Sequence, residues 1–401
     1  MNKALEGVRI LDFSHLLQGP FATQLLGDMG ADVVKVERAG AGDMFRGMTF
    51  FAKWVGGSES PNFLAWNRNK RSIALNLKSR KVHAILMEMA KTADVVVQNF
   101  RPGVLAKLGY GYEDFKAVNP RIIYCSGSGY GEEGPYVERP GQDMLIQGLA
   151  GLIANTGRGD QAPVPAGAGL ADQIGAMNMV YGILSALYYR EKTGKGQKIE
   201  VNLLAGLLAH LNQEYVAVLN LGEDFVRPNS GIGHPGMQAP FGIYEAKDGG
   251  YISIAMSPFK TLYEVLEAPQ LAVYDDLKTL FDKRDEVFEK VNAETKKFAT
   301  QDLLVRLLAA DIWCAEVKDI RRAAEDPQVK HMGMITSYEH PRGGKVRVVA
   351  PAVKMSETPA TIERPAPLVG QHGREILAEF GLSKEEIAAL EACGDMTVDA
   401  A

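Results

Sequence analysis

The sequence predicts an α/β fold in which a mostly parallel, doubly wound (Rossmann-like) sheet forms the larger of two domains. In the first half of the chain, short apolar runs typical of strands alternate with amphipathic stretches typical of helices. The 401 residues exceed what one hydrophobic core usually supports. A Gly/Pro-rich passage at residues 227–236 then separates this half from a region rich in charged helices.

The expected elements begin with a strand over residues 8–13, a helix over 20–29 and a second strand over 31–36. Pro20 suits the first turn of a helix, where its missing N–H has no partner to lose. The alternation continues with strands expected over 72–77, 94–97 and 121–125 and a helix ending near residue 91. Repeated strand-helix-strand units of this kind predict parallel pairing.

An uncharged stretch over residues 173–189 predicts a buried helix. It contains Gln173, Asn178 and two glycines, so a membrane span explains it less well. Residues 192–197 are expected to form the turn that ends this helix, followed by a strand over 198–202 and a helix from Leu203.

The two domains are assigned from this pattern. Residues 1–220 and 331–401 are expected to form the large α/β domain, with the C-terminal part packing back on the first half. Residues 221–330, with a strand near 250–255 and helices to about residue 324, are expected to form a smaller α+β domain.

Composition narrows the class of function. A net charge of −5 provides no general attraction to nucleic acid or anionic lipid, so neither nucleic acid nor membrane is an expected partner. Three scattered cysteines predict neither a disulfide framework nor a metal site. The first residues lack the apolar core of a signal peptide, which favours a cytoplasmic location.

Common catalytic motifs are missing from the sequence. Glu37 stands where a ribose-binding acid would follow a second strand, but residues 14–20 contain no G-x-G-x-x-G, so NAD is not expected. No H-E-x-x-H, G-x-S-x-G or Walker motif is present. No metal ligand is therefore assigned.

Asp172 is the most informative residue. It lies between a small-residue run, 166–171, and the apolar helix. One interpretation is an N-cap whose carboxylate accepts hydrogen bonds from free backbone N–H groups. The other is a nucleophile that its surroundings keep ionised, with Gly167 and Gly169 allowing a bulky substrate to approach.

Basic residues recur after the predicted strands. Arg38, Lys78, Arg101 and Lys107 would line the carboxyl edge of one sheet, where they could neutralise phosphates while Phe100 packs on an adenine. His15 lies in a comparable loop, where ligands of doubly wound sheets gather. This pattern predicts a nucleotide-like ligand bound without a glycine fingerprint.

Six motifs in order resemble the family III CoA-transferases, which include formyl-CoA and carnitine CoA-transferases and related acyl-CoA racemases. They are Leu11-Asp-Phe-Ser-His-Leu-Leu-Gln-Gly-Pro20, Gly27-Asp-Met-Gly-Ala-Asp-Val-Val-Lys-Val-Glu-Arg38, Asn69-Lys-Arg-Ser-Ile73, Asn99-Phe-Arg-Pro-Gly103, Gly141-Gln-Asp143 and Lys192-Thr-Gly-Lys-Gly-Gln197. The resemblance extends over almost the whole chain.

The resemblance implies that Asp172 attacks an acyl-CoA thioester and passes through mixed-anhydride and aspartyl-CoA intermediates. It implies CoA or acyl-CoA as a substrate, with no permanently bound cofactor. The implied CoA site contains His15, Leu17, Gln18, Arg38, Leu75, Asn76, Leu77, Lys78, Asn99, Phe100, Arg101 and Lys107. It also implies a homodimer in which two chains interlock, with each active site between domains of different chains.

Two alternatives remain open. An α-methylacyl-CoA racemase shares the fold and the aspartate but needs a second acid/base. Gln142 and Ser257 stand where that branch has a His and a Glu, and Gln142 cannot exchange a proton at neutral pH, so a transferase is favoured. The other alternative is a CoA-binding protein without catalysis.

The substrates are less constrained. Met48 replaces a gating Trp of the formyl-CoA branch and Gln18 is displaced by one position from its glutamine, so formate and oxalate are not favoured. Arg46 could bind the distal carboxylate of a larger acid or form a structural ion pair. Residues Gly231, Gly233 and Gly236 resemble a shielding loop of the family.

Overall fold

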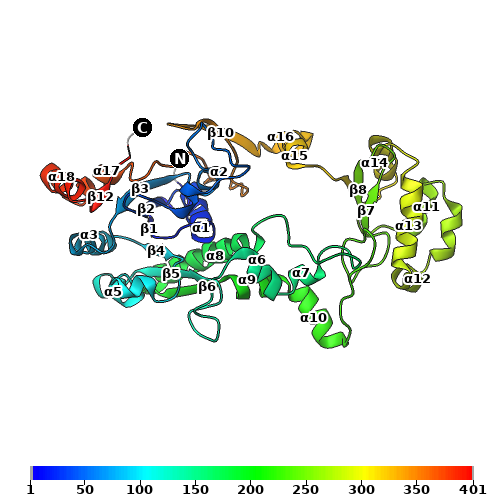
Figure 1. Ribbon diagram of the computed structural model, residues 1–401, viewed down its shortest axis with the longest axis horizontal. Coiled ribbons are helices and arrows are strands. Elements are labelled where there is room, and N and C mark those ends of the chain that lie inside the picture. The colour runs from blue at the N-terminus through cyan, green and yellow to red at the C-terminus, as the bar shows by residue number, and fades with distance from the viewer. Residues whose placement is uncertain (1–2, 400–401) are drawn as a thin grey trace. The chain divides into compact units, whose positions relative to one another are not determined.

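The computed structural model describes residues 3–399, which divide into two compact units (Figure 1). The first unit contains residues 3–146, 169–209 and 327–399, and the second contains 147–168 and 210–326. The second unit is therefore inserted into the sequence of the first.

A seven-stranded sheet forms the centre of the first unit, in the order β12-β3-β2-β1-β4-β5-β6. Its strands are β1 (Arg9–Asp12), β2 (Asp32–Arg38), β3 (Lys70–Leu75), β4 (Val95–Gln98), β5 (Ile123–Ser128), β6 (Lys198–Asn202) and β12 (Met396–Thr397). All neighbours pair in parallel except β12, which is antiparallel to β3. The predicted mostly parallel sheet is confirmed.

Helices cover both faces of this sheet, which explains its continuous apolar strands. In β4, Val95 and Val97 belong to one core cluster, whereas Val96 belongs to the other. The first cluster includes side chains of α1 (Gln18–Asp28) and α8 (Leu170–Thr193). The opposite cluster includes side chains of α3 (Arg80–Ala90), α5 (Tyr112–Val118), α17 (Gly373–Glu379) and α18 (Lys384–Ala392).

Shorter elements complete the first unit. They are the 3-10 helix η1 (Met44–Gly47), the helices α2 (Pro61–Trp66), α4 (Val104–Lys107), α9 (Leu203–His210) and α16 (Pro327–Met332), and the hairpin of β10 (Ile335–His340) and β11 (Gly344–Val349). Helix α6 (Asp143–Leu149) begins in the first unit and ends in the second.

The start of β3 differs from the sequence expectation because its first two residues are charged. Lys70 is fully buried, with its ammonium group 3.0 Å from the Asp12 carboxylate. The Arg71 guanidinium pairs with Asp32 and also with two glutamates of α17. Buried charges with partners fit a central strand, which hydrophobic patterning alone does not predict.

The apolar helix α8 is buried along one side only. Ala176, Met179 and Ile183 are in the core, but Tyr181 and Tyr188 are 65% and 64% exposed. The expected buried helix is therefore buried along one side in the single chain. The helix ends as expected in residues 192–197, with Gly194 in the left-handed conformation at φ 72°.

The second unit has its own core around a three-stranded antiparallel sheet. The strands are β7 (Gly242–Glu245), β8 (Tyr251–Ile254) and β9 (Cys314–Glu316). The helices are α7 (Leu152–Asn155), α10 (Asn212–Leu221), α11 (Phe259–Val265), η2 (Pro269–Tyr274), α12 (Leu277–Asp282), α13 (Arg284–Thr295), α14 (Thr300–Ala309) and α15 (Ile320–Ala324). Tyr244, Leu262 and Val291 are among its buried side chains.

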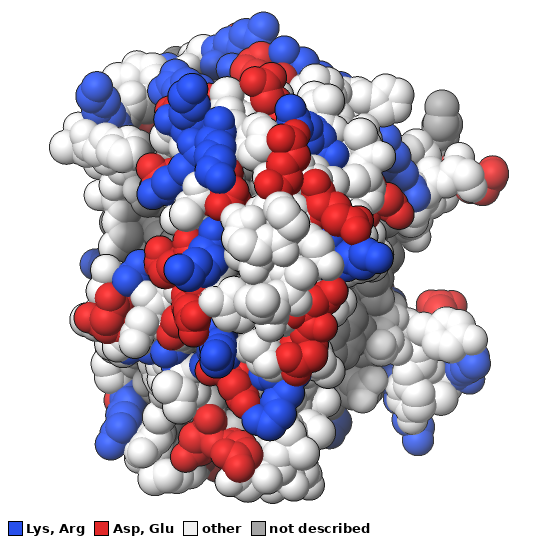
Figure 2. Space-filling model, turned by 90° about the vertical axis from the view of Figure 1, so that its right-hand side faces the viewer, with Lys and Arg blue, Asp and Glu red and all other residues white. Residues whose placement is uncertain are grey.

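Charged side chains of both signs are interspersed on the face displayed in Figure 2. Ion pairs on the surface of the second unit include Lys260 with Glu264 and Lys296 with Glu245. No helix among residues 3–399 combines the length and the apolar character that a membrane crossing requires.

The pairing of β12 with β3 generates a stability prediction. Met396 is 2% exposed and belongs to the core cluster beneath α18. Met396→Ala should lower the free energy of unfolding by about 2 to 4 kcal/mol, because it leaves a cavity in that core. Urea denaturation followed by fluorescence measures the change.

Met332→Ala is the matched control, because Met332 lies in the same unit and is 39% exposed. Its free energy of unfolding should change by less than about 0.5 kcal/mol. Equal losses for the two variants would contradict the packing described for β12.

Candidate active site

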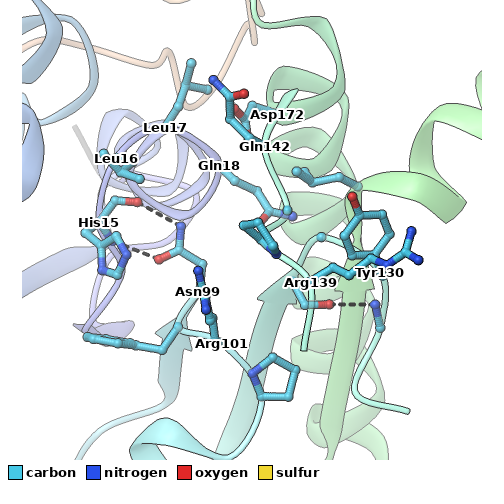
Figure 3. Close-up of a pocket in the computed structure, with 18 of the residues that line it drawn as sticks. His15, Leu16, Leu17, Gln18, Asn99, Arg101, Tyr130, Arg139, Gln142 and Asp172 are labelled. Atoms are coloured by element: carbon cyan, nitrogen blue, oxygen red, sulfur yellow. Dashed lines mark hydrogen bonds between the residues drawn. The ribbon is translucent and has the colours of Figure 1, made fainter. Parts of the chain in front are cut away.

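A cavity of about 290 Å³ lies where the carboxyl ends of the parallel strands meet, within the first unit. The loop after β1, the segment after β4, the loop after β5 and the first turn of α8 all line it (Figure 3). Among the predicted residues, His15, Leu17, Gln18, Asn99, Phe100, Arg101 and Asp172 line this cavity. Ligands of open α/β sheets bind at such edges.

Asp172 lies in the first turn of α8, but it is not the residue that caps this helix. The N-cap position is Gly169, and Asp143 supplies the capping carboxylate. One oxygen of Asp143 accepts hydrogen bonds from the backbone N–H groups of Ala171 and Asp172, at 2.7 and 3.4 Å. The expectation of an N-cap role for Asp172 is therefore wrong, and its carboxylate is not committed to the helix backbone.

The surroundings of Asp172 disfavour its charge. Burial, together with the nearby carboxylate of Asp143, raises the pKa of Asp172 to about 7. The expectation that Asp172 is kept fully ionised is therefore wrong at and below neutral pH. When this carboxyl group does ionise, its oxygens are poorly solvated and more basic than those of an ordinary aspartate.

Glycines permit the close packing around this end of the cavity. A Cβ atom at Gly169 would lie 3.3 Å from the Leu17 side chain. Gly129 and Gly141 approach each other so closely that neither could carry a side chain, which closes the loop between them at its base. This contact fixes the position from which Gln142 enters the cavity wall.

Gln18 occupies a slot between two further glycines. It is 4% exposed, and a Cβ at Gly127 of β5 or Gly175 of α8 would lie within 2.5 or 2.7 Å of its amide. The amide nitrogen has no hydrogen-bond partner among the residues that the structure describes. The sequence identified Gln18 but could not show that it is wedged beside the helix of Asp172.

His15 is held by its backbone rather than by its ring. The amide of Asn99 accepts a hydrogen bond from the His15 N–H at 2.9 Å and donates one to the His15 carbonyl at 2.8 Å (Figure 3). The imidazole packs edge-on against Phe100, and burial lowers the pKa of His15. A neutral, packed imidazole suits a ligand-contact surface.

The basic strand ends divide into two groups. Arg101 lines the cavity. Arg38, Lys78 and Lys107 are exposed at the same edge of the sheet, but they lie outside the cavity. No ion pair involves any of these four within residues 3–399. They are available to an anionic ligand that extends beyond the cavity.

The predicted segment 75–78 is less accessible than expected. Leu75 is fully buried in the core, so its side chain cannot touch a ligand. The Asn76 amide donates a hydrogen bond to Asp395, and Leu77 packs against the core. Within this segment, Lys78 is the exposed side chain.

The sequence analysis missed the contribution of residues 129–141. This loop follows β5 and brings Tyr130 and Arg139 to the cavity, on the side opposite His15 in Figure 3. The Arg139 guanidinium stacks over Tyr136, 3.7 Å from the ring centre. The available signal was the same as for the other cations, a basic residue in a Gly/Pro-rich loop after a strand.

Other candidates have structural partners. Arg46 forms a two-pronged ion pair with Glu37, with both contacts at 2.7 Å, so its structural role is the correct alternative. The Ser257 hydroxyl, in the second unit, accepts a hydrogen bond from the Trp313 N–H. The described part of the chain has no group of three or more His, Cys, Asp or Glu arranged to hold a metal ion.

The Gly231 to Gly236 passage is packed within the second unit. A Cβ at Gly231 would lie 2.5 Å from Phe288, and one at Gly236 would lie 2.8 Å from Phe225. The Gly233 N–H donates to the carbonyl of Phe241. Close packing accounts for these glycines, and their role as a shielding loop stays a prediction.

The chain is similar to known proteins over most of its length. A family model described as CoA-transferase family III matches residues 5–373. Human succinyl-CoA:glutarate CoA-transferase is 37% identical over 383 residues, covering 94% of this chain and 86% of that protein. Formyl-CoA:oxalate CoA-transferase of Streptomyces coelicolor is 33% identical, covering 98% of this chain and 99% of that protein.

A solved structure is similar as well. The crystal structure of a CAIB/BAIF family protein from Brucella suis matches with a TM-score of 0.84 and 32% identity, covering 95% of this chain and all of that one. The chain belongs to the family III CoA-transferases. It is an acyl-CoA:carboxylate CoA-transferase, and enzymes of this class use CoA thioesters as substrates.

The raised pKa of Asp172 predicts how stability depends on pH. The pKa of this carboxyl group is 3.8 in an unperturbed aspartate and about 7 in the folded protein, so its ionisation lowers folding stability as pH rises between these values. Asp172→Asn removes that cost. The variant should gain thermal stability over the parent as pH rises from 4 to 7, and the gain should level off above about pH 7.

Differential scanning calorimetry of the two proteins at matched pH measures this gain. Asp143→Asn, which keeps an oxygen to cap α8 but removes the neighbouring charge, should lower the pH at which the gain levels off. A difference in melting temperature that does not change with pH would contradict the raised pKa.

Proposed function

We propose that this enzyme moves CoA from an acyl-CoA donor to a carboxylic acid acceptor through covalent intermediates on Asp172. One observation carries the proposal: Asp172 is the single carboxylate among the described residues that line the cavity. Its oxygens are not used to cap α8, because Asp143 does so. A desolvated carboxylate without a competing role is suited to nucleophilic attack.

The reaction divides into four acyl transfers. The Asp172 carboxylate attacks the donor thioester carbonyl, which forms a mixed anhydride and releases CoA thiolate. The thiolate attacks the Asp172 carbonyl, which gives an aspartyl-CoA thioester and releases the donor acid. The acceptor carboxylate attacks this thioester to form a second anhydride, and the thiolate then attacks the acceptor's acyl carbonyl, which restores Asp172.

Water must be kept from these intermediates, because anhydrides and thioesters hydrolyse to free acids and the activation of the acyl group is then lost. The partly buried position of Asp172 and the tight packing of Leu17, Gln18 and the surrounding glycines support such exclusion. The neutral amide of Gln142 lines the same cavity and cannot act as a general acid or base at neutral pH. This favours a transferase over a racemase, which needs a second acid/base.

The cavity is large enough for a thioester and a short acid but not for the whole of CoA, so the nucleotide portion would lie outside it. The exposed cations Arg38, Lys78 and Lys107 at the same edge would neutralise its phosphates. Arg101 and Arg139, at the cavity, would face the part of the ligand that joins the two regions.

Dicarboxylic acids are the first acyl groups to test. Relatives from human and Agrobacterium fabrum are named succinyl-CoA:glutarate and succinate–glutarate CoA-transferases. A relative from Acetobacter aceti is named acetyl-CoA:oxalate CoA-transferase, at 35% identity, so short acids belong in the same assay.

We also propose an interlocked homodimer located in the cytoplasm. The side of α8 that carries Tyr181 and Tyr188 is apolar and exposed in the single chain, which supports burial against a second copy. Analytical ultracentrifugation should give a dimer mass that persists on dilution, because interlocked chains cannot separate without unfolding.

Asp172→Asn should lower the transfer rate at least about a thousand-fold, because the amide cannot form an anhydride. The measurement is a matrix of acyl-CoA donors against carboxylic acids. Mass spectrometry of the parent enzyme quenched during turnover should find CoA bound, with loss of one water, on the peptide that contains Asp172. A variant that turns over at the parent rate would overturn the mechanism.

The racemase alternative is tested in the same preparation. In deuterium oxide, a racemase would exchange the α-proton of a 2-methylacyl-CoA without any acceptor acid, whereas the proposed transferase should not. A CoA-binding protein without catalysis would show neither exchange nor transfer.

Lys78→Gln and Lys107→Gln should each raise the KM for acyl-CoA about five-fold, with kcat unchanged, because each removes one exposed contact to phosphate. The effect should shrink as salt concentration rises. Lys91→Gln is the control, since Lys91 is also exposed but follows α3 at the opposite edge of the sheet. Equal KM values for all three variants would place the nucleotide elsewhere.

A further inference from the structure

Asp43 is a buried carboxylate that joins two separate segments of the cavity wall. It follows β2, immediately before η1, and is 4% exposed. One of its oxygens accepts hydrogen bonds from the backbone N–H of Leu16 at 3.1 Å and of Phe45 at 2.9 Å. Leu16 belongs to the loop after β1 and Met44, beside Phe45, begins η1, and both residues line the cavity with Asp172.

The loop that Asp43 holds is conformationally strained. Leu16 has a φ of 65°, in the left-handed region that branched and bulky side chains disfavour. Gly19, in the first turn of the following helix α1, could not carry a Cβ without overlapping the Ser14 side chain. Strain of this kind persists only where the surrounding contacts enforce it.

Three successive residues of the loop are fixed through backbone atoms. The ammonium group of Lys35 donates a hydrogen bond to the Ser14 carbonyl at 2.8 Å. Asn99 binds both the N–H and the carbonyl of His15, and Asp43 binds the N–H of Leu16. The directions of the His15, Leu17 and Gln18 side chains therefore depend on these backbone contacts, and two of them come from Lys35 and Asp43, which are buried and do not line the cavity.

Lys35 and Asp43 form an ion pair of 2.8 Å, and both side chains are 1% exposed. Desolvating two charges offsets most of the gain from pairing them, and an apolar pair of similar volume would often stabilise a fold as well. Stability alone is therefore a weak reason for this pair. The distinctive property of the pair is that it orients the backbone of the loop. Asp43 accepts a hydrogen bond from the strained Leu16 N–H, and the Lys35 ammonium group donates one to the Ser14 carbonyl.

We propose that Asp43, supported by Lys35, is a positioning residue that holds the loop after β1 and the segment beginning at Met44 in the arrangement that binds acyl-CoA beside Asp172. It acts through the backbone of Leu16 and touches no substrate. The inference rests on the proposed function, which supplies the identity of the ligand. Neither residue is among the CoA-site residues that the sequence predicted.

The first test is Asp43→Asn. The variant should bind CoA more weakly and lose about ten-fold to a hundred-fold in kcat/KM for acyl-CoA, with kcat lowered as well as KM raised, because a misplaced wall affects both binding and attack. Calorimetric titration with CoA measures binding without any chemistry at Asp172. Activity is compared at a temperature at which circular dichroism shows both proteins to be folded.

The matched control is Asp28→Asn. Asp28 is equally buried and pairs with Arg68 at 2.7 Å in the same unit, away from the residues that line the cavity. This variant should lose thermal stability while its kcat/KM stays within about two-fold of the parent. If Asp43→Asn also keeps the parent values of kcat/KM and CoA affinity, the inference is wrong and Asp43 is structural only.

A rescue experiment tests the strained backbone directly. Asparagine adopts the left-handed conformation more readily than leucine. Leu16→Asn should therefore recover part of the kcat/KM lost in Asp43→Ala, although by itself it should not improve the parent enzyme. No recovery would contradict the role assigned to the Leu16 N–H.

If Asp43→Asn does not fold, the double variant Lys35→Met with Asp43→Asn removes both buried charges and is measured in the same way. It should fold and show the same loss of CoA affinity, and an unchanged affinity would overturn the inference. If the parent enzyme itself binds no CoA, the proposed function fails and not the positioning role.

Discussion

The buried ion pair between Asp12 and Lys70 is the contact on which the carboxyl edge of the sheet depends. Both side chains are fully buried, and their charged atoms are 3.0 Å apart. Burial raises the pKa of Asp12, but the charges of Lys70 and Lys35 and hydrogen bonds from Ser14 and Thr23 lower it by more. The pKa of Asp12 is therefore about 2. One carboxylate thus ties the end of the central strand β1 to the start of β3, to the following loop and to α1.

Asp143 and Asp172 have different roles at the start of α8, and this difference determines the chemistry that the site can support. Asp143 satisfies the backbone at the start of α8, which leaves Asp172 in the first turn of the helix with its oxygens uncommitted. Because Asp143 caps the helix, both oxygens of Asp172 are available for the proposed nucleophilic attack. The same neighbour that frees Asp172 also raises its pKa, together with burial, so structure and reactivity are coupled here.

Much of the fold was predictable, because apolar runs and glycine turns are local signals. The parallel order of β1, β2 and β4 follows from such runs, as does the end of α8 at Gly194. Elements that depend on distant partners could not be predicted. Lys70 is charged, yet it begins a buried strand. The two residues of β12 form a strand only because they pair with β3. The residues of the candidate site were likewise predictable where the signal is local and not where it depends on a distant partner.

In the site, Asp172, His15 and Arg101 were identifiable by motif and position, and the structure brings all three to one cavity. The pKa of Asp172 was not predictable, because Asp143 lies 29 positions earlier in the chain and reaches α8 only through the fold. Arg139 was overlooked for a similar reason, since its loop closes through the contact of Gly129 with Gly141.

The antiparallel pairing of β12 with β3 also has a consequence for biosynthesis. Strand β3 is buried along its whole length, and its outer edge is covered by residues 396 and 397 and by His372, which hydrogen-bonds to the backbone of Ser72. Because these partners lie far along the chain from β3, its outer edge stays open to pairing with other chains until they have been synthesised and have folded back.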